Sequence, residues 1–371
     1  MSSGTTVPDL LSQIDCEDMT NIALGGAFLG TGGGGDPYIG KLLAEQALNE
    51  HGPVAVLQVD QLADDDLIVP VAMMGAPTVM LEKLPRGDEA NAALDALQKV
   101  IGRKARAVFC IEAGGLNSTI PIAVAATAGL PIVDADGMGR AFPELQMVSM
   151  TLHDISACPM VMADEKGNSI VLNTVDNLST EKFARVITVE MGGAGLIALY
   201  PMTGAEAKQA ALRESMSLIY SIGAIITSEQ TANRNPAQRL RDDLSGVRLF
   251  EGRVMDVDRR TEGGFARGTC AIQGLGPDAG HSLTLEFQNE FLLAKTSAGV
   301  PLAMTPDLIC LLDLETGQPI TTEQMRYGFR VIVFGLPCNP QWRSEHGLKL
   351  VGPRYFGYDR DYQPINELNP D

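Results

Sequence analysis

The chain has 371 residues, of which 39 are glycine, and its 28 lysines and arginines stand against 46 aspartates and glutamates. The formal charge of −18 at pH 7 disfavours binding to nucleic-acid backbones and anionic membrane surfaces, which carry charge of the same sign. The glycines follow no fixed period, which excludes collagen-like and repeat architectures. At this length we expect two domains.

The first part of the chain alternates helical and strand patterns. Apolar residues at helical spacing predict a helix from Asp15 to Phe28, and Asp36 followed by Pro37 predicts the start of a second helix. Strands are then expected at 54–59, 67–74, 107–112 and 131–134, with helices at 88–101 and 119–129. This order is typical of the α/β class, with a mostly parallel sheet and helices on both faces.

The second part of the chain changes in texture. Residues 160–163 and 170–173 predict a hairpin, 186–190 and 196–200 predict strands, and a helix capped by Thr203 is expected to reach Ile225. After residue 235, short apolar segments separated by glycine turns predict a smaller β-rich domain. We therefore expect an α/β domain with glycine-rich loops at 1–235 and a β-rich domain at 236–371.

The N-terminal residues lack the basic and apolar segments of a secretion signal, so we expect a cytoplasmic protein. The six cysteines form no CxxC pair and are expected to be free thiols, several of them buried. The uncharged run between Glu112 and Asp134 has the length of a membrane span. Its prolines and glycines favour a buried strand-loop-helix-strand passage instead, so no membrane contact is expected.

The glycine-rich segment from Gly30 to Gly35 matches the spacing GxGxxG, but a helical pattern precedes it where a dinucleotide fold needs a strand. Its backbone N–H groups, with those at the start of the following helix, suit an anion or a substrate. The candidate binding residues are Thr31, Gly32, Gly33, Gly34 and Gly35. A tight turn between two helices is the alternative interpretation.

A carboxylate followed by glycines ends a predicted strand at Glu112, and a second such loop follows Glu190. Ligands of parallel sheets bind beyond the carboxyl ends of the strands. Glu112 is therefore a candidate base, and Gly114, Gly115 and Asn117 are candidate substrate contacts. The alternative is a turn whose glutamate caps the next element.

The densest polar segment runs from Asp134 to Glu144. Asp134 and Asp136 could serve as acid and base, and Arg140 could hold a substrate carboxylate. A salt-bridged turn that caps the next helix is the alternative. The four histidines form no HxH or HExxH pair, which makes a two-zinc site hard to assemble. One divalent metal bound by His153 with Asp134 and Asp136 stays open, although the favoured interpretation needs no cofactor.

Five segments resemble a bacterial family, the S-methyl-thiohydantoin desulfurase-like family, whose members are associated with hydantoinase/oxoprolinase-type proteins. The segments are LGTGGGGDPYIG, DADGMGRAFPELQM, LEFQNEFLLA, TPDLICLLDLETGQPI and LVGPRYFGYD, and they span nearly the whole chain. The resemblance implies hydrolysis at a carbon of a small cyclic ureide or thiohydantoin; in one branch, water replaces a methylthio group and methanethiol leaves. Asn289 and Glu290 lie in one of these motifs and would face the substrate cleft or pair across the domain boundary.

We therefore expect a hydrolase that acts on a small anionic cyclic substrate between two domains, in a homo-oligomer that binds neither nucleic acid nor membrane. Two other functions stay open. The chain could be a non-catalytic ligand-binding or accessory subunit of a hydantoinase/oxoprolinase-type complex. It could also be a nucleotide-dependent enzyme that binds phosphates with Gly30–Gly35.

Overall fold

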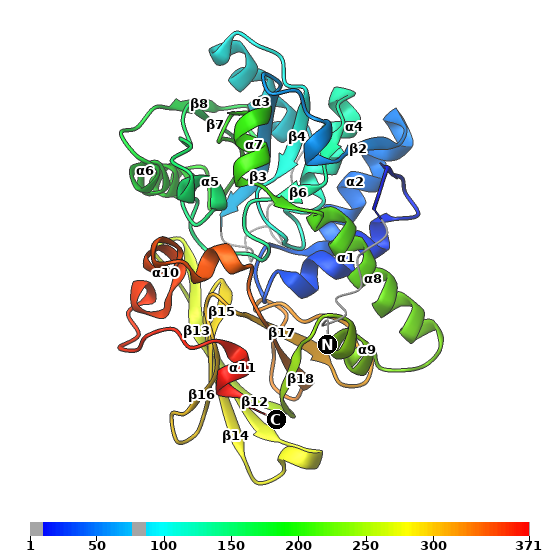
Figure 1. The fold of residues 1–371 in the computed structure, drawn as a ribbon, viewed down its shortest axis with the longest axis vertical. Coiled ribbons are helices and arrows are strands. Elements are labelled where there is room, and N and C mark those ends of the chain that lie inside the picture. Colours follow the sequence, from blue (N-terminus) through cyan, green and yellow to red (C-terminus); the bar gives the residue numbers. More distant parts are fainter. Residues whose placement is uncertain (1–9, 76–86, 371) are drawn as a thin grey trace.

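The computed structural model describes residues 10–75 and 87–370, which form two sheets stacked along the long axis of the molecule (Figure 1). The first sheet has the strand order β1-β2-β5-β4-β3-β9-β7-β8, and β10 pairs with β3. Its strands are β1 (Gln13–Ile14), β2 (Val54–Leu57), β3 (Leu67–Gly75), β4 (Ala107–Cys110), β5 (Ile132–Val133), β7 (Met160–Ala163), β8 (Ser169–Leu172), β9 (Ala194–Ala198) and β10 (Met202–Thr203). Strands β2, β5, β4 and β3 are parallel, which confirms the α/β class.

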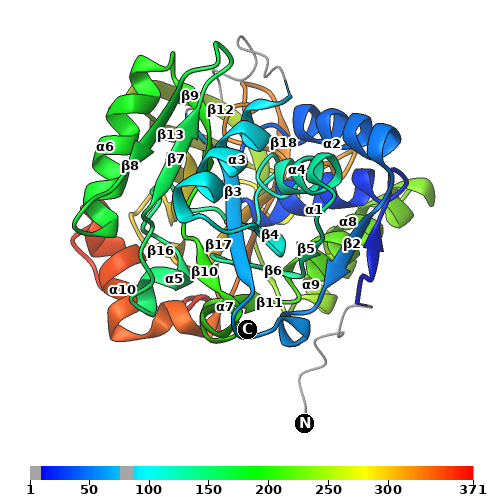
Figure 2. The same cartoon turned by 90° about the horizontal axis from the view of Figure 1, so that it is seen from above.

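Helices pack around this sheet, and in Figure 2 β3 lies at the centre with α6 on one side and α2 on the other. They are α1 (Met19–Leu29), α2 (Pro37–His51), α3 (Glu89–Ile101), α4 (Ile120–Ala128), α5 (Ser149–Leu152), α6 (Asn177–Glu190), α7 (Gly204–Ala210), α8 (Ser215–Thr231) and α9 (Ala237–Asp243). As predicted, Asp36 caps α2, because its carboxylate accepts the N–H groups of Tyr38 at 2.8 Å and Ile39 at 3.2 Å.

Two predicted elements are wrong. Residues 186–190 end helix α6 instead of forming a strand, although their sequence is rich in β-branched residues. Asp176 starts α6 by accepting the N–H of Ser179 at 2.7 Å. The long helix expected after Thr203 is two helices, α7 and α8. They are separated because β11 (Leu212–Arg213) pairs with β6 (Ala135–Asp136).

The second sheet is antiparallel, with the order β16-β15-β14-β13-β12-β18-β17, and confirms the β-rich C-terminal part. Its strands are β12 (Val247–Glu262), β13 (Phe265–Gly274), β14 (Ser282–Gln288), β15 (Glu290–Thr296), β16 (Pro301–Met304), β17 (Leu308–Asp313) and β18 (Arg330–Leu336). Strand β16 was not expected from the sequence. Helices α10 (Glu345–Val351) and α11 (Ile365–Leu368) follow.

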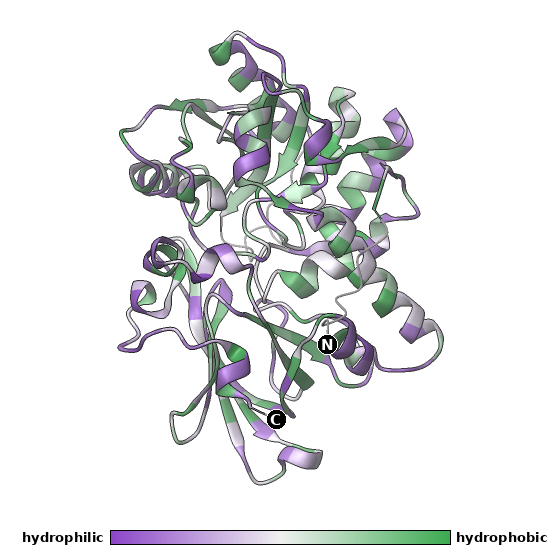
Figure 3. Cartoon of the chain, in the orientation of Figure 1, coloured by the Kyte–Doolittle hydropathy of each residue, from purple (hydrophilic) through white to green (hydrophobic). Residues whose placement is uncertain are grey.

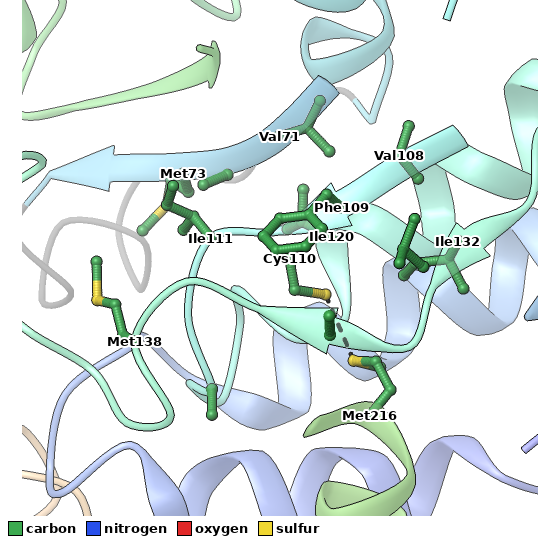
Figure 4. Packing of buried hydrophobic residues seen from close by; sticks show 14 of the residues in the cluster. Val71, Met73, Val108, Phe109, Cys110, Ile111, Ile120, Ile132, Met138 and Met216 are labelled. Atoms are coloured by element: carbon green, nitrogen blue, oxygen red, sulfur yellow. Dashed lines mark hydrogen bonds between the residues drawn. The ribbon is translucent and has the colours of Figure 1, made fainter. Parts of the chain in front are cut away.

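The main core is built on β3 and β4, whose side chains are buried on both faces of the sheet. Hydrophobic residues gather in these central strands (Figure 3). Figure 4 shows Phe109 of β4 beside Ile120, the first residue of α4, and a contact between the Cys110 thiol and the Met216 sulfur, which lie 3.4 Å apart. All six cysteines are free and four are buried, as predicted. In the part of the chain that the structure describes, no helix has both the length and the apolar character needed to cross a membrane.

Candidate active site

A pocket opens beyond the carboxyl ends of β3 and β4, at the meeting of the two sheets. It contains about 530 Å³ of space, part of it open to solvent. We call it the junction pocket. Its described lining is Gly34, Gly35, Ala72, Met73, Met74, Gly75, Ile111, Glu112, Asn117, Met138, Phe142, Pro143, Glu144, Leu145, Arg185, Ile197, Asn289 and Glu290. This edge of a parallel sheet is where ligands bind in α/β proteins.

Glu112 is held at the floor of the junction pocket by Asn117. Its Oε1 accepts a hydrogen bond from Asn117 Nδ2 at 2.6 Å. The Asn117 amide also bonds both backbone groups of Met73 in β3, accepting from N at 2.8 Å and donating to O at 3.2 Å. Burial raises the pKa of Glu112 to about 7, although the hydrogen bonds from Asn117 and the Phe142 backbone oppose the rise. A carboxyl that titrates near neutrality suits a general base.

Glu290 enters the junction pocket from the second sheet. It follows Asn289, which has the left-handed φ of 58° and whose Oδ1 accepts the Ala266 N–H at 2.8 Å. Glu290 is 3% exposed, and its Oε2 has no hydrogen-bond partner among the described residues. Burial raises the pKa of Glu290 well above its ordinary value, and the charge of nearby Glu112 raises it further. The junction pocket thus contains two buried carboxyls, and the charge of Glu112 adds to the effect of burial on the pKa of Glu290.

The glycine-rich loop fills the space between the two sheets. The Thr31 carbonyl accepts the Phe291 N–H of β15 at 2.8 Å, and the Gly32 carbonyl accepts the Thr322 N–H at 2.8 Å. A Cβ on Gly33 would stand 1.9 Å from Glu290 Oε1, so this position must be glycine if Glu290 is to reach the pocket.

On its other side the loop contacts the first sheet. The Gly34 carbonyl accepts the N–H groups of Leu116 at 2.7 Å and Asn117 at 3.3 Å. A Cβ on Gly114 would stand 2.7 Å from Gly34 Cα, so the two backbones touch. Gly115 lies beside them, where a Cβ would stand 2.6 Å from the Gly35 carbonyl. The loop is therefore a tight connection between helices, as in the alternative interpretation, and Gly34 and Gly35 also line the pocket. The N–H groups of the first turn of α2 that a phosphate would use already bind the carboxylate of Asp36.

Asp134 and Asp136 hold the beginning of α8. Asp134 accepts the Ser217 N–H at 3.0 Å and the Ser217 hydroxyl at 2.5 Å. Asp136 accepts the Ser215 hydroxyl at 2.6 Å and the Gly139 N–H at 2.7 Å. Neither aspartate is among the described residues that line the junction pocket. Their bonds give both a structural role at the N-terminus of a helix.

We expect Asp134→Asn to leave turnover within about twofold and to lower the free energy of unfolding by about 1–2 kcal/mol, because charge-assisted hydrogen bonds to Ser217 are lost. Urea unfolding and an activity assay on the same preparation measure both effects. A turnover loss above tenfold with unchanged stability would return Asp134 to the catalytic set.

Arg140 joins the two sheets and is fully buried. Its guanidinium donates to the carbonyls of Ala141, Pro306 and Asp307, each at 2.9 Å, to Thr31 Oγ1 at 2.9 Å and to the Phe291 carbonyl at 3.3 Å. A guanidinium has five N–H donors, so these bonds leave none for a substrate carboxylate. The structure places Arg140 behind the pocket wall, where it also lies over the Phe142 ring at 4.5 Å.

The described residues contain no group of three His, Cys, Asp or Glu side chains arranged to hold a metal ion. His153, Asp134 and Asp136 all lie within the described part of the chain, so the structure does not bring these three together. His153 ends the short helix α5. The candidate metal ligands of the sequence analysis therefore have no common site here.

Sequence reasoning missed Arg185 and Glu144. Arg185 belongs to α6 and lines the pocket. The sequence predicted a strand at 186–190, and no motif there indicated that Arg185 has a role. Glu144 accepts hydrogen bonds from Gln146 and from the Tyr355 hydroxyl, each at 2.6 Å. Glu144 ends the polar segment that begins at Asp134, but no sequence pattern assigned it a role, because its partner Tyr355 lies in a distant segment.

The chain is thus a two-domain α/β protein, in which an antiparallel β domain shares with the α/β domain a pocket lined by two buried carboxyls. The chain belongs to the S-Me-THD-like family, since the models of its N-terminal and C-terminal domains match residues 17–174 and 175–365. This confirms the resemblance noted in the sequence.

One similar solved structure is the X-ray structure of a protein from Chromobacterium violaceum. It is 26% identical in sequence and superposes with a TM-score of 0.79 over 95% of this chain and 99% of that one. The two chains therefore share their fold over nearly their whole lengths. Comparison with curated proteins finds no match.

Proposed function

We propose that the protein is a hydrolase of a small anionic cyclic ureide or thiohydantoin, with its reaction in the junction pocket. The observation that carries this proposal is the pair of buried carboxyls, Glu112 and Glu290, at the pocket floor. Two titratable groups whose environments give them different proton affinities are suited to act as base and acid. Family membership supports thiohydantoin-type chemistry.

In the proposed reaction, Glu112 acts as the base and Glu290 as the acid. Glu112 takes a proton from a water molecule, whose oxygen attacks the ring carbon that carries the methylthio group. Protonated Glu112 passes that proton to the ring nitrogen, so the ring carbon now carries a hydroxyl and the methylthio group. The carbon–sulfur bond then breaks as protonated Glu290 donates its proton to the departing sulfur. The hydroxyl proton passes to the Glu290 carboxylate as the carbonyl forms, which returns both carboxyls to their starting forms. The two protons of the water end on the ring nitrogen and on methanethiol, so the products are the hydantoin and the thiol.

This assignment predicts the pH dependence of turnover. Glu112 must be deprotonated to act as a base, and its pKa is about 7. We expect kcat/KM to rise from pH 6 to pH 8 with an apparent pKa near 7, and to fall again only where Glu290 loses its proton. Initial rates across this range measure the profile. A profile that is flat between pH 6 and 8 would exclude Glu112 as the base.

A non-catalytic accessory subunit is the second candidate function, and exposed apolar side chains favour it. Val175 is 94% exposed, and Phe183, Val186 and Val189 are each more than half exposed on α6. Such residues mark surfaces that bind other polypeptides, either a second copy of this chain or a hydantoinase-type subunit. We favour the enzyme because the buried Glu290 Oε2 has no hydrogen-bond partner among the described residues and can therefore interact with a substrate in the pocket. The free thiols agree with the expected cytoplasmic location.

Thiol release from an S-methyl-thiohydantoin that carries a propionate tests the proposal, run beside hydantoins and 5-oxoproline, with and without a chelator. Turnover that survives the chelator is expected. Turnover abolished by the chelator would mean that a metal ion acts in a site that these residues do not form. No turnover of any substrate, together with a stable complex with a hydantoinase-type protein, would support the accessory subunit.

A further inference from the structure

We infer that Arg185 is the residue that selects a negatively charged substrate group in the junction pocket, and that a hairpin of the second sheet holds it in place. The inference rests on the proposed function for the identity of the pocket. It goes further by naming the residue that recognises the negative charge of the substrate and the residues that position it. Arg140, which the sequence suggested for this role, has all its donors engaged.

Among the described residues that line the pocket, Arg185 alone is cationic. Its Nε donates to Glu181 Oε1 at 2.7 Å and its Nη2 donates to the Pro143 carbonyl at 3.0 Å. These two bonds fix the plane of the guanidinium and use two of its five N–H donors. The remaining donors, including both on Nη1, can meet a carboxylate in the planar two-bond geometry that arginine favours.

The surroundings of Arg185 make an anion acceptable in an acidic protein. The charge of −18 is spread over the molecule and is screened beyond about 8 Å at physiological salt, so the local groups decide. Burial raises the pKa of Glu290 and of Glu112, which favours their neutral forms and so lowers their repulsion toward an anion. Only 11% of the Arg185 side chain is exposed, so its attraction for a carboxylate is screened less than at an open surface.

The hairpin between β12 and β13 positions Arg185. The guanidinium carbon of Arg185 lies 4.2 Å from the centre of the Phe265 ring, a cation–π contact. A Cβ on Gly264 would stand 2.7 Å from Arg185 Cδ, so the hairpin backbone lies directly against the arginine stem. The second sheet therefore contributes both Glu290 and the support of Arg185. Phe265 is a positioning residue in this arrangement.

Binding of hydantoin-5-acetate and its neutral counterpart hydantoin-5-acetamide to the full chain tests the inference by calorimetry. We expect the wild type to bind the acetate roughly ten- to hundredfold more tightly than the acetamide. Arg185→Gln should remove most of this preference, and Arg185→Lys should retain part of it. Phe265→Leu, which keeps an apolar side chain but removes the aromatic face, should reduce the preference severalfold through Arg185.

Arg267→Gln is the matched control. Arg267 also lies over the Phe265 ring, at 5.6 Å, but it is exposed and is not among the described residues of the pocket. Its variant should keep the wild-type preference. The preference is the ratio of the affinities for the acetate and the acetamide, measured on one preparation. A partly unfolded preparation affects both affinities equally, so the ratio does not change. Thermal unfolding checks that each variant is folded.

An equal preference for the acetate in wild type and Arg185→Gln would overturn the inference, as would a loss of preference in Arg267→Gln alone. The hydrolase proposal can fail separately. If no substrate is turned over while the acetate preference still depends on Arg185, the pocket binds anionic rings without hydrolysing them. If turnover occurs without any preference for the anion, the hydrolase proposal stands and the role of Arg185 falls.

Discussion

We expect Glu112→Gln to lower kcat by about 10² to 10⁴ while the protein stays folded, because glutamine cannot take a proton from water. Glutamine has nearly the same shape, and its side-chain oxygen can still accept the 2.6 Å hydrogen bond from Asn117. Steady-state thiol release measures the rate, and thermal unfolding measures the fold. A variant that retains more than a tenth of wild-type turnover would exclude Glu112 as the base.

The same variant should show a pH-dependent gain in stability. The pKa of Glu112 is about 7 in the folded protein, above its ordinary value of 4.5, so the folded state binds the proton more tightly than the unfolded state. Wild-type stability must therefore fall as the pH rises from about 4.5 through 7, by at most about 3 kcal/mol from this group. Glu112→Gln lacks this loss, so its unfolding free energy relative to wild type should increase from pH 5 to pH 8. If the difference in unfolding free energy between the variant and the wild type did not change with pH, the pKa of Glu112 would not be raised in the folded protein.

Arg140→Met should lower the free energy of unfolding by at least about 3 kcal/mol, because it leaves the carbonyls of Pro306, Asp307 and Phe291 without their guanidinium donors. Methionine fills part of the space, so the loss reports the missing hydrogen bonds more than a cavity. Urea unfolding measures it. We expect the preference of the remaining folded protein for an anionic ligand to stay unchanged.

Arg343→Met is the matched control for Arg140. Arg343 stands 3.5 Å from Asp307, but about a third of its side chain is exposed, so its loss should lower stability by less than about 1 kcal/mol. If Arg140→Met were as stable as wild type and had lost the preference for an anionic ligand, Arg140 would be the substrate anchor after all.

Local signals predicted the elements that carry the pocket. The Asp36-Pro37 pair located the start of α2, and the apolar runs located β3 and β4. A carboxylate and glycines at the end of a buried strand pointed to Glu112, which lines the pocket, since parallel strands present their carboxyl ends at one edge. These predictions depend only on residues that are close together in the sequence.

The same local signal at Asp134 pointed to chemistry, where the structure shows a helix cap. Which of two carboxylates is free depends on the hydroxyl of Ser217, far along the chain, and nothing near Asp134 reveals it. The sequence likewise suggested that Arg140 could bind a substrate, whereas in the structure it donates to the carbonyls of Pro306 and Asp307, which lie far along the chain. Arg185 became visible only through its contact with Phe265. Tertiary contacts decide the availability of a polar group, and no spacing rule replaces them.

The place of β9 in the first sheet shows that this sheet is built from both of the segments that the family models match. Strand β9 lies between β3 and β7, although the N-terminal family model ends at residue 174, before β9 begins. A fragment that ends at that boundary would lack β9, so the facing edges of β3 and β7 would have unpaired backbone groups. Exposed strand edges of this kind promote aggregation. It would also lack Arg185 and Glu290. The first sheet is therefore complete only when both matched segments are present, although the family models divide the chain at residue 174.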